Sequence, residues 1–309
     1  MTINTPVVVC VFNRPDHTLE LMKALARPAP SQLMVVADGP RPDLIDDPEK
    51  CEAALQIVRQ NIVWPCAVAW NISKTNLGCR NRIQSGLDWV FSQVDSAIIL
   101  EDDCIPDPTF FQYCGTLLDK YRDRPEVGVI SGSNPFAAGD RDSFCVNGES
   151  YMFSRYPLIW GWATWRRAWQ NYDPDMTEWQ MLRQTDWLST VLADPLAVSY
   201  WRAAFNRVLD GFDAWDYSLN YSLWRHDALT IIPRVNMIRN IGFGPEATHT
   251  KFYDSRADQK SSPMDMPFLH PPRIVQNSAF DTEYERTWCS GTQTQLMERL
   301  RASIRAKGG

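Results

Sequence analysis

Three consecutive carboxylates, Glu101, Asp102 and Asp103, follow a short apolar run at residues 97–100. Like charges beside a buried strand repel one another and are costly to desolvate unless a cation compensates them. Hard oxygen ligands favour Mg²⁺ or Mn²⁺, and such ions usually bind one or two protein carboxylates and leave their other positions to water and phosphate. The run therefore indicates a divalent-cation site for a diphosphate-bearing ligand, with an exposed acidic turn as the alternative.

A second candidate region is the aromatic segment 160–165, which reads Trp-Gly-Trp-Ala-Thr-Trp. The chain has 13 tryptophans, and most of them lie between Trp160 and Trp224. Indole rings stack on sugars and nucleobases, but they also fill protein cores. Trp162 and its neighbours could therefore wall a ligand pocket, or they could form a tightly packed turn before a helix.

The first part of the chain alternates apolar runs with helical patterns, which is typical of a parallel sheet covered by helices. We expect strands at residues 7–12, 32–37, 65–70, 97–100 and 127–131, and helices at 16–27, 48–60, 78–91 and 110–121. Ligands of such sheets bind beyond the carboxyl ends of the strands. The polar residues there are Asn13, Arg14, Asp38, Asn71 and the acidic run.

The pattern changes after about residue 140. We expect strands at 148–154 and 229–233, and helices at 163–172, 187–193, 196–210 and 216–226. Residues 254–283 are polar and proline-rich and read as a loop, and residues 293–306 read as a terminal amphipathic helix.

Composition limits the classes of function. The net charge is −6 without a long basic run, which argues against nucleic acid as a partner. The sequence has no signal peptide and no apolar stretch of membrane-spanning length, so we expect a cytoplasmic protein with eight reduced cysteines. The basic segment 297–305 leaves a peripheral contact with the inner membrane face open.

Several enzyme classes lack their motifs. No GxGxxG follows the first strand, which excludes a typical dehydrogenase, and Asn13 stands where a phosphatase would need an aspartate nucleophile. No motif supports a Ser or Cys nucleophile beside a histidine. A nucleotidyltransferase that makes nucleotide-sugars and a non-catalytic nucleotide- or sugar-binding protein remain as alternatives. The absence of glycine after the first strand counts against the former.

Several segments together resemble a known family. Residues 9–15 read Val-Cys-Val-Phe-Asn-Arg-Pro, residues 76–78 read Asn-Leu-Gly, and the acidic run is followed by Pro106, Asp107 and the segment Phe-Phe-Gln-Tyr at 110–113. This combination resembles N-acetylglucosaminyltransferase I and its bacterial relatives, most clearly over residues 6–135.

The resemblance implies an α/β protein of the GT-A class, with a Rossmann-like, mostly parallel central sheet flanked by helices and a smaller C-terminal acceptor-side subregion. Residues 1–135 would be the donor-binding half and residues 136–309 the acceptor and catalytic half of one continuous domain. The implied activity is inverting, metal-dependent transfer of a sugar from a UDP-sugar to a glycan or lipid-linked acceptor. N-acetylglucosamine is one candidate sugar, and the oligomeric state stays open.

By this resemblance, Asp103 would bind Mn²⁺ or Mg²⁺ directly. Glu101 and Asp102 would contact the ribose or sugar of the donor. Arg14 and Asp38 would hold the nucleotide, with Asp38 accepting a hydrogen bond from the uracil ring.

Further contacts follow from the same resemblance. Arg80 and Arg82 lie where a contact with the donor phosphate or sugar is expected, and Trp162 could wall the pocket. His249 follows a glycine-rich segment and is a candidate phosphate contact, although a lone histidine is more often structural.

The family uses a carboxylate base in a Trp-Asp-Asp-Trp segment, and here residues 212–217 read Phe-Asp-Ala-Trp-Asp-Tyr. Asp216 follows the tryptophan and is the first candidate, and Asp213 is the second. An inverting transfer needs one base to accept the proton of the attacking hydroxyl. Asp216 also begins a helical pattern, so the role of a helix N-cap is its alternative.

Overall fold

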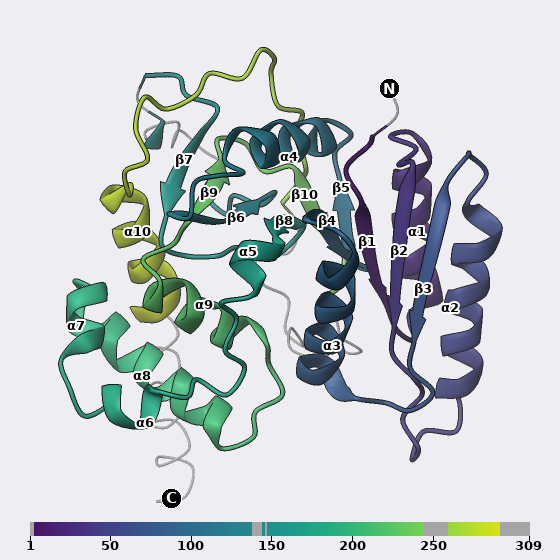
Figure 1. The fold of residues 1–309 in the computed structure, drawn as a ribbon, viewed down its shortest axis with the longest axis horizontal. Coiled ribbons are helices and arrows are strands. Elements are labelled where there is room, and N and C mark those ends of the chain that lie inside the picture. Colours follow the sequence, from purple (N-terminus) through teal and green to yellow (C-terminus); the bar gives the residue numbers. More distant parts are fainter. Residues whose placement is uncertain (1–2, 138–143, 146, 244–258, 291–309) are drawn as a thin grey trace, which may run out of the picture.

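The computed structural model of the protein describes residues 3–137, 144–145, 147–243 and 259–290. Its centre is a sheet of eight strands in the order β3-β2-β1-β4-β8-β6-β9-β7 (Figure 1). The strands of the first half are β1 (Val7–Val11), β2 (Gln32–Ala37), β3 (Ala67–Ile72) and β4 (Ser96–Glu101).

These four strands form a continuous parallel block. Val9 of β1 lies opposite Val35 of β2 on one side and Leu100 of β4 on the other. Every residue of β1 is buried, as expected for an apolar strand that is covered on both faces. The predicted strand-helix alternation in this part of the chain is therefore confirmed.

Helices cover both faces of the sheet. Those on one face pack against Val7, Val9 and the other odd-numbered residues of β1, and they are α1 (Pro15–Ala26), α2 (Asp47–Asn61) and α4 (Thr109–Lys120). Those on the opposite face pack against Val8 and Cys10, and they are α3 (Gly78–Gln93), α5 (Arg166–Trp169) and α9 (Asp216–Arg225).

The second half of the chain completes the same sheet. Its strands are β6 (Val127–Ser131), β7 (Tyr151–Ser154), β8 (Trp162–Trp165) and β9 (Leu229–Pro233). Strand β8 lies between β4 and β6 and is antiparallel to both. The expectation of a helix at 163–172 was wrong, because the residues of β8 alternate between the two buried faces of the sheet. Only the four-residue helix α5 follows it.

A smaller helical part packs below this end of the sheet (Figure 1). It contains α6 (Trp179–Leu182), α7 (Trp187–Val191), α8 (Pro195–Leu209), α10 (Ser278–Tyr284) and the π-helix η2 (Glu285–Ser290). Helix α8 begins at an N-cap, since the Asp194 side chain accepts a hydrogen bond from Leu196 N. Helix α10 corrects the expectation of a loop up to residue 283, and the predicted helix at 293–306 lies outside the described residues.

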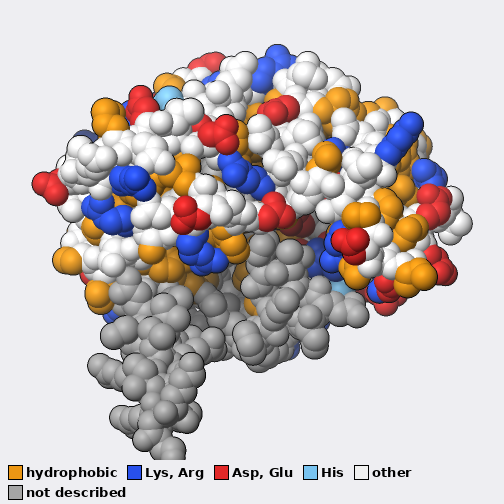
Figure 2. All heavy atoms as spheres, turned by 90° about the horizontal axis from the view of Figure 1, so that it is seen from below, with side chains coloured by type: hydrophobic (Ala, Val, Ile, Leu, Met, Phe, Trp, Pro, Cys, Tyr) orange, Lys and Arg blue, Asp and Glu red, His pale blue; other side chains and the backbone are white. Residues whose placement is uncertain are grey.

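The predicted fold class, an α/β protein with a mostly parallel central sheet flanked by helices, is confirmed. Strands from both halves of the chain pair within one sheet. None of the helices in the described residues is both long and apolar enough to cross a membrane. On the face shown in Figure 2, the Lys and Arg side chains of the described residues are interspersed with Asp and Glu.

Candidate functional site

The acidic run lies at the carboxyl end of the central strand β4. Glu101 is the last residue of β4 and lies opposite Cys10 of β1. Asp102 is almost fully buried, whereas Glu101 and Asp103 are partly exposed. The loop after β1, which carries Arg14, lies at the same edge because β1 and β4 are parallel neighbours. The edge predicted from the sequence therefore does bring these side chains together.

Arg14 bridges two of the three carboxylates. Its Nη1 donates to Asp103 Oδ2 over 2.9 Å, its Nη2 donates to Asp102 Oδ1, and its Nε lies 3.4 Å from Asp102 Oδ2. At Asp102 the charge of Arg14 favours the ionised carboxylate and opposes the larger effect of burial, which raises its pKa. Arg14 immediately precedes α1, so the first turn of that helix fixes its position.

The positive charge of Arg14 is smaller than the negative charge around it. Burial raises the pKa of Glu101 above its usual value, and repulsion from Asp103, Asp102 and Asp216 adds to this effect, while Arg14 opposes it. Burial likewise raises the pKa of Asp102, again against the attraction of Arg14. Glu101 thus interacts electrostatically with three other acids, Asp102, Asp103 and Asp216, but with only one arginine among the groups that shift its pKa. This excess of negative charge favours the binding of a further cation.

The donor atoms fit one particular kind of metal site. The described residues contain no group of three or more His, Cys, Asp or Glu placed to hold a metal ion. Asp103 offers a hard, partly exposed carboxylate, of which Oδ2 accepts from Arg14 and Oδ1 lies 3.4 Å from Cys104 Sγ. The residues present therefore fit a cation of the Mg²⁺ or Mn²⁺ type that takes Asp103 from the protein and its remaining ligands from water and phosphate.

A backbone segment from the second half of the chain lies against Asp103. Strand β10 (Ile238–Asn240) pairs antiparallel with β5 (Cys104–Pro106), and Ile241 N donates to Asp103 O over 2.9 Å. A Cβ atom added at Gly242 would lie 2.0 Å from Asp103 Oδ2. Only glycine leaves room for this carboxylate. The sequence shows a glycine-rich segment there but not what it contacts.

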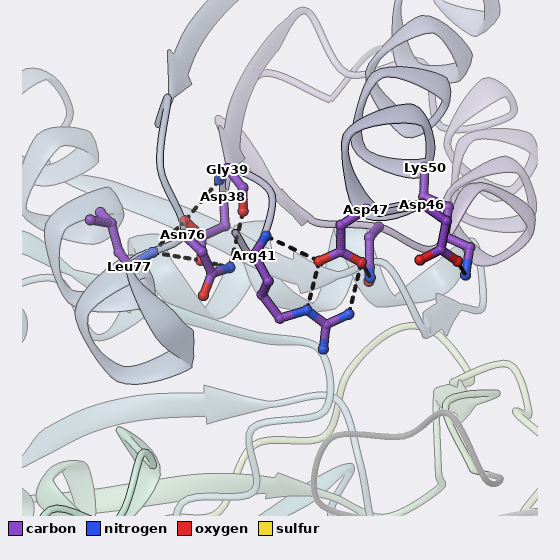
Figure 3. A network of polar contacts seen from close by, with 9 residues as sticks. Asp38, Gly39, Arg41, Asp46, Asp47, Lys50, Asn76 and Leu77 are labelled. Carbon is purple, nitrogen blue, oxygen red and sulfur yellow. Dashed lines mark hydrogen bonds and ion pairs between the residues drawn. The ribbon is translucent and has the colours of Figure 1, made fainter. Parts of the chain in front are cut away.

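Asp38 is engaged in a network at the end of β2 (Figure 3). Its Oδ1 accepts from Gly39 N and Leu77 N, each over 2.9 Å, and its Oδ2 accepts from Asn76 Nδ2 over 3.1 Å. Burial raises the pKa of Asp38, while the hydrogen bonds from these backbone groups oppose the shift. Asp38 thereby ties β2 to the start of α3, and its predicted contact with the nucleotide stays a prediction.

The neighbouring loop holds an ion pair that the sequence analysis did not identify (Figure 3). Buried Asp47 accepts from Arg41 Nε over 2.6 Å, from Arg41 Nη2 over 2.8 Å and from Asn13 Nδ2 over 2.7 Å. The Arg41 guanidinium lies over the Phe12 ring, 5.3 Å from its centroid. This network joins the ends of β1 and β2 beside the acidic run. The one local sign of this network in the sequence is the acid Asp47, which directly precedes the helix expected at 48–60.

The two arginines of α3 contact other parts of the protein. The Arg82 Nη2 atom donates to Asn71 O over 2.7 Å and to Asn71 Oδ1 over 2.6 Å, at the end of β3. Arg80 pairs with Asp175 over 2.9 Å. The Nε atoms of both arginines are buried without a hydrogen-bond partner. Their expected role toward a donor stays a prediction.

The two candidate bases differ in their surroundings. Both carboxylate oxygens of Asp213 accept backbone hydrogen bonds, from Cys79 N over 2.9 Å and from Arg80 N over 2.8 Å. Asp213 thus acts as a cap for α3 from a distant part of the chain. Asp216 is the first residue of α9, lines a cavity and contributes to the raised pKa of Glu101.

This cavity has a volume of about 270 Å³ and lies between the sheet and the smaller helical part. Aromatic rings from separate elements line it, among them Trp160 before β8, Tyr217 of α9 and Trp288 of η2. It also borders Asn240 of β10, which pairs with Cys104 directly after the acidic run. Asn240 thus borders the cavity and, through its pairing with Cys104, lies beside the residue that follows the acidic run.

Two further candidates have other locations. Trp162 is buried in β8, where its ring stacks on Trp215 with centroids 5.5 Å apart and packs near Trp169. Its neighbour Trp160, two residues earlier, borders the cavity instead. His249 lies outside the described residues.

The comparisons with known proteins give only distant likenesses. No protein-family model matches the sequence, and no curated protein matches it. The chain is similar to the solved mannosyltransferase PcManGT from Pyrobaculum calidifontis in complex with GDP-Man and Mn²⁺, at 14% identity and a TM-score of 0.33 over 52% of this chain and 44% of that one. It is also similar to glucosyl-3-phosphoglycerate synthase from Mycobacterium tuberculosis in complex with Mg²⁺ and UDP, at 13% identity and a TM-score of 0.29 over 58% and 66%.

A third solved structure, a UDP-glucose pyrophosphorylase complexed with UDP-glucose, has 11% identity and a TM-score of 0.27 over 41% of this chain and 56% of that one. The chain thus spans less than two thirds of the length of each of these proteins. Similarity at this level does not assign an activity, which has to be argued from the site itself.

Proposed function

We propose that this protein is a nucleotide-sugar glycosyltransferase of the GT-A class that transfers a sugar to a saccharide-bearing acceptor. The observation that carries the proposal is the position of the acidic run. It lies at the carboxyl end of β4, and a cavity lined by aromatic rings and Asp216 borders Asn240, the β10 residue that pairs with Cys104 directly after the run. Ligands of open α/β sheets bind at such an edge. The resemblance to N-acetylglucosaminyltransferase I makes UDP-N-acetylglucosamine the first donor to test.

The donor diphosphate would bind beside Asp103 and Arg14. A divalent cation held by Asp103 would neutralise the diphosphate and stabilise it as a leaving group. Arg14 would orient the phosphates with its guanidinium, which already lies within hydrogen-bond distance of Asp103. Burial and neighbouring acids raise the pKa of Glu101 and of Asp102, so a cation bound at this edge would favour the ionised form of both carboxyls.

Asp216 would be the general base. The oxygen of an acceptor hydroxyl attacks the anomeric carbon while Asp216 takes its proton, and the bond from that carbon to the diphosphate oxygen breaks. The electron pair of the broken bond leaves with the nucleotide. The position of Asp216 in the wall of the cavity supports it as the base, because Asp213 is not among the described residues that line this cavity. One base and direct attack by the acceptor would invert the anomeric centre.

The proposal is tested by measuring UDP release from UDP-sugars in the presence of saccharide acceptors, with Mn²⁺ or with EDTA. Asp216→Asn keeps the size of the side chain but removes the base, so turnover should fall by roughly 10²–10⁴-fold with little change in donor affinity. Asp186→Asn, at an exposed position before α7, is the control and should retain full activity. Full transfer activity in Asp216→Asn would contradict the assignment of the base. Release of pyrophosphate from a nucleoside triphosphate and a sugar phosphate would instead identify a nucleotidyltransferase.

A further inference from the structure

The cavity beside Asp216 offers ring faces from several directions. Trp160 and Phe243 meet edge to face with centroids 5.6 Å apart, and Tyr284 and Trp288 stack with centroids 4.7 Å apart. All four rings line the cavity and are partly exposed. The C–H face of a sugar ring packs well on aromatic rings, whose apolar area is large and rigid.

The polar groups of the cavity are mainly amides and hydroxyls. Asn220, Asn236, Asn240 and Gln259 line it together with Ser133. An amide group both donates and accepts hydrogen bonds, as a sugar hydroxyl does. Bonds within the protein orient several of these amides, since Asn220 Nδ2 donates to Asp216 O over 2.9 Å and Asn236 Nδ2 donates to Ile238 O over 2.7 Å. A long acyl chain would offer no hydrogen bond to their remaining polar atoms, and burying a polar group without a partner is costly. The wall is therefore suited to a polyhydroxylated ring.

The described residues that line the cavity carry a single charged side chain, which is negative. Among the described lining residues there is no Lys, Arg or His, and Asp216 is the only Asp or Glu. Asp216 also interacts electrostatically with Glu101 of the acidic run. An anionic group placed in this cavity would meet the negative charge of Asp216, and the lining residues that the structure describes offer no cation to compensate it.

The volume of the cavity sets the size of the ligand. At about 270 Å³ it lies just below the range of roughly 300–1,000 Å³ that is typical of small-molecule pockets. This suits a single sugar ring with its hydroxyls.

We infer that this cavity binds one uncharged sugar ring of the acceptor, and that it discriminates against sugar phosphates and uronic acids. The inference rests on the proposed function, because it makes the cavity the acceptor side of the same site. It goes beyond that proposal by naming the chemical class of the group that receives the transferred sugar.

The test measures saccharide binding in the absence of any donor, so that it does not depend on nucleotide binding. Saturation-transfer NMR is recorded with the methyl glycosides of glucose, galactose, mannose and N-acetylglucosamine, and with glucose 6-phosphate, glucuronate and octyl glucoside. At least one neutral glycoside should give a signal, and the two anions should give none at the same concentration. In Trp160→Ala and Trp288→Ala the signal should fall at least fivefold, whereas Trp70→Ala, on β3 at the other edge of the sheet, should leave it unchanged.

Circular dichroism and the melting temperature of each variant show whether it is folded, and the two tryptophans from separate elements give independent tests. Equal or stronger binding of glucose 6-phosphate or glucuronate would overturn the inference. Saturation transfer confined to the octyl chain of octyl glucoside would overturn it in favour of a lipid. Unchanged binding in both tryptophan variants would place the saccharide elsewhere. UDP binding measured separately by calorimetry shows whether the proposed function itself fails.

Discussion

Arg14 and Asp103 form an ion pair in which the guanidinium Nη1 lies 2.9 Å from the carboxylate Oδ2. The same guanidinium also pairs with Asp102, which is almost fully buried. Arg14 therefore compensates part of the negative charge of the acidic run. It also donates a hydrogen bond to one oxygen of Asp103, the carboxylate that we propose as a metal ligand. A cation bound at Asp103 and the charge of Arg14 would act on the same acids.

This relationship predicts that a metal ion can partly replace Arg14 in stabilising the fold. Arg14→Gln removes the charge opposite buried Asp102 and should lower the free energy of unfolding by about 1–3 kcal/mol, less than for a fully buried pair because Arg14 is partly exposed. Mn²⁺ should restore part of this loss. Urea unfolding with Mn²⁺ and with EDTA measures both effects.

Arg41→Gln is the matched control for this prediction. It breaks the ion pair with Asp47, which is another buried carboxylate, but this pair is separate from that of Arg14 and the acidic run. Its loss of stability should not respond to Mn²⁺. If Mn²⁺ stabilised both variants equally, or neither of them, the link between Arg14 and a metal site would be wrong.

Gly242 should be required for access to Asp103. In Gly242→Ala the new Cβ atom would lie 2.0 Å from Asp103 Oδ2, so the carboxylate or the β10 segment has to move. We expect at least a tenfold weaker Mn²⁺-dependent binding of UDP, measured by calorimetry, in a protein that is still folded.

Gly115→Ala, on helix α4, serves as the control. A Cβ atom added there would contact only Thr5 Oγ1, at 3.2 Å. It should bind UDP as the unaltered protein does. Unchanged UDP affinity in Gly242→Ala would show that the Asp103 carboxylate is not used in the position described here.

The ion pair of Arg41 and Asp47 should contribute to the acid stability of the protein. Hydrogen bonds from Arg41 lower the pKa of Asp47 well below its usual value. Because this pKa is lower in the folded than in the unfolded state, ionised Asp47 stabilises the fold above the ordinary carboxyl pKa of about 3.9. Its contribution decreases as the pH falls from there toward the folded-state pKa.

Asp47→Asn should therefore destabilise the protein at pH 7 and have a smaller effect at pH 3. Urea unfolding of both proteins at pH 3, 4 and 7 gives this comparison. A difference in stability that did not change with pH would mean that Asp47 acts through its packing and neutral hydrogen bonds alone.

The sequence was informative where structure depends on local patterns. Strand β9 begins and ends where its apolar run does, at Leu229 and Pro233, and β2 likewise spans Gln32–Ala37. The acidic run and Arg14 could be placed at one edge because parallel strands end on the same side.

Features that depend on long-range contacts could not be predicted in this way. The insertion of β8 between β4 and β6 follows from pairing on both sides, which periodicity does not encode. For the same reason the sequence could not distinguish Trp162, in the core, from Trp160, at the cavity. The bonds of Asp213 to the start of α3 join residues more than a hundred positions apart, so no local signal indicated them.

Calorimetric titration with UDP, UDP-N-acetylglucosamine, UDP-glucose, UDP-galactose and GDP-mannose, each with Mn²⁺ and with EDTA, tests the central claim most directly. We predict that one of these nucleotide-sugars binds in the presence of Mn²⁺, that EDTA removes or strongly weakens the binding, and that Asp103→Ala abolishes it while Asp186→Asn does not. If none of these nucleotides binds in either condition, the protein is not the glycosyltransferase proposed here.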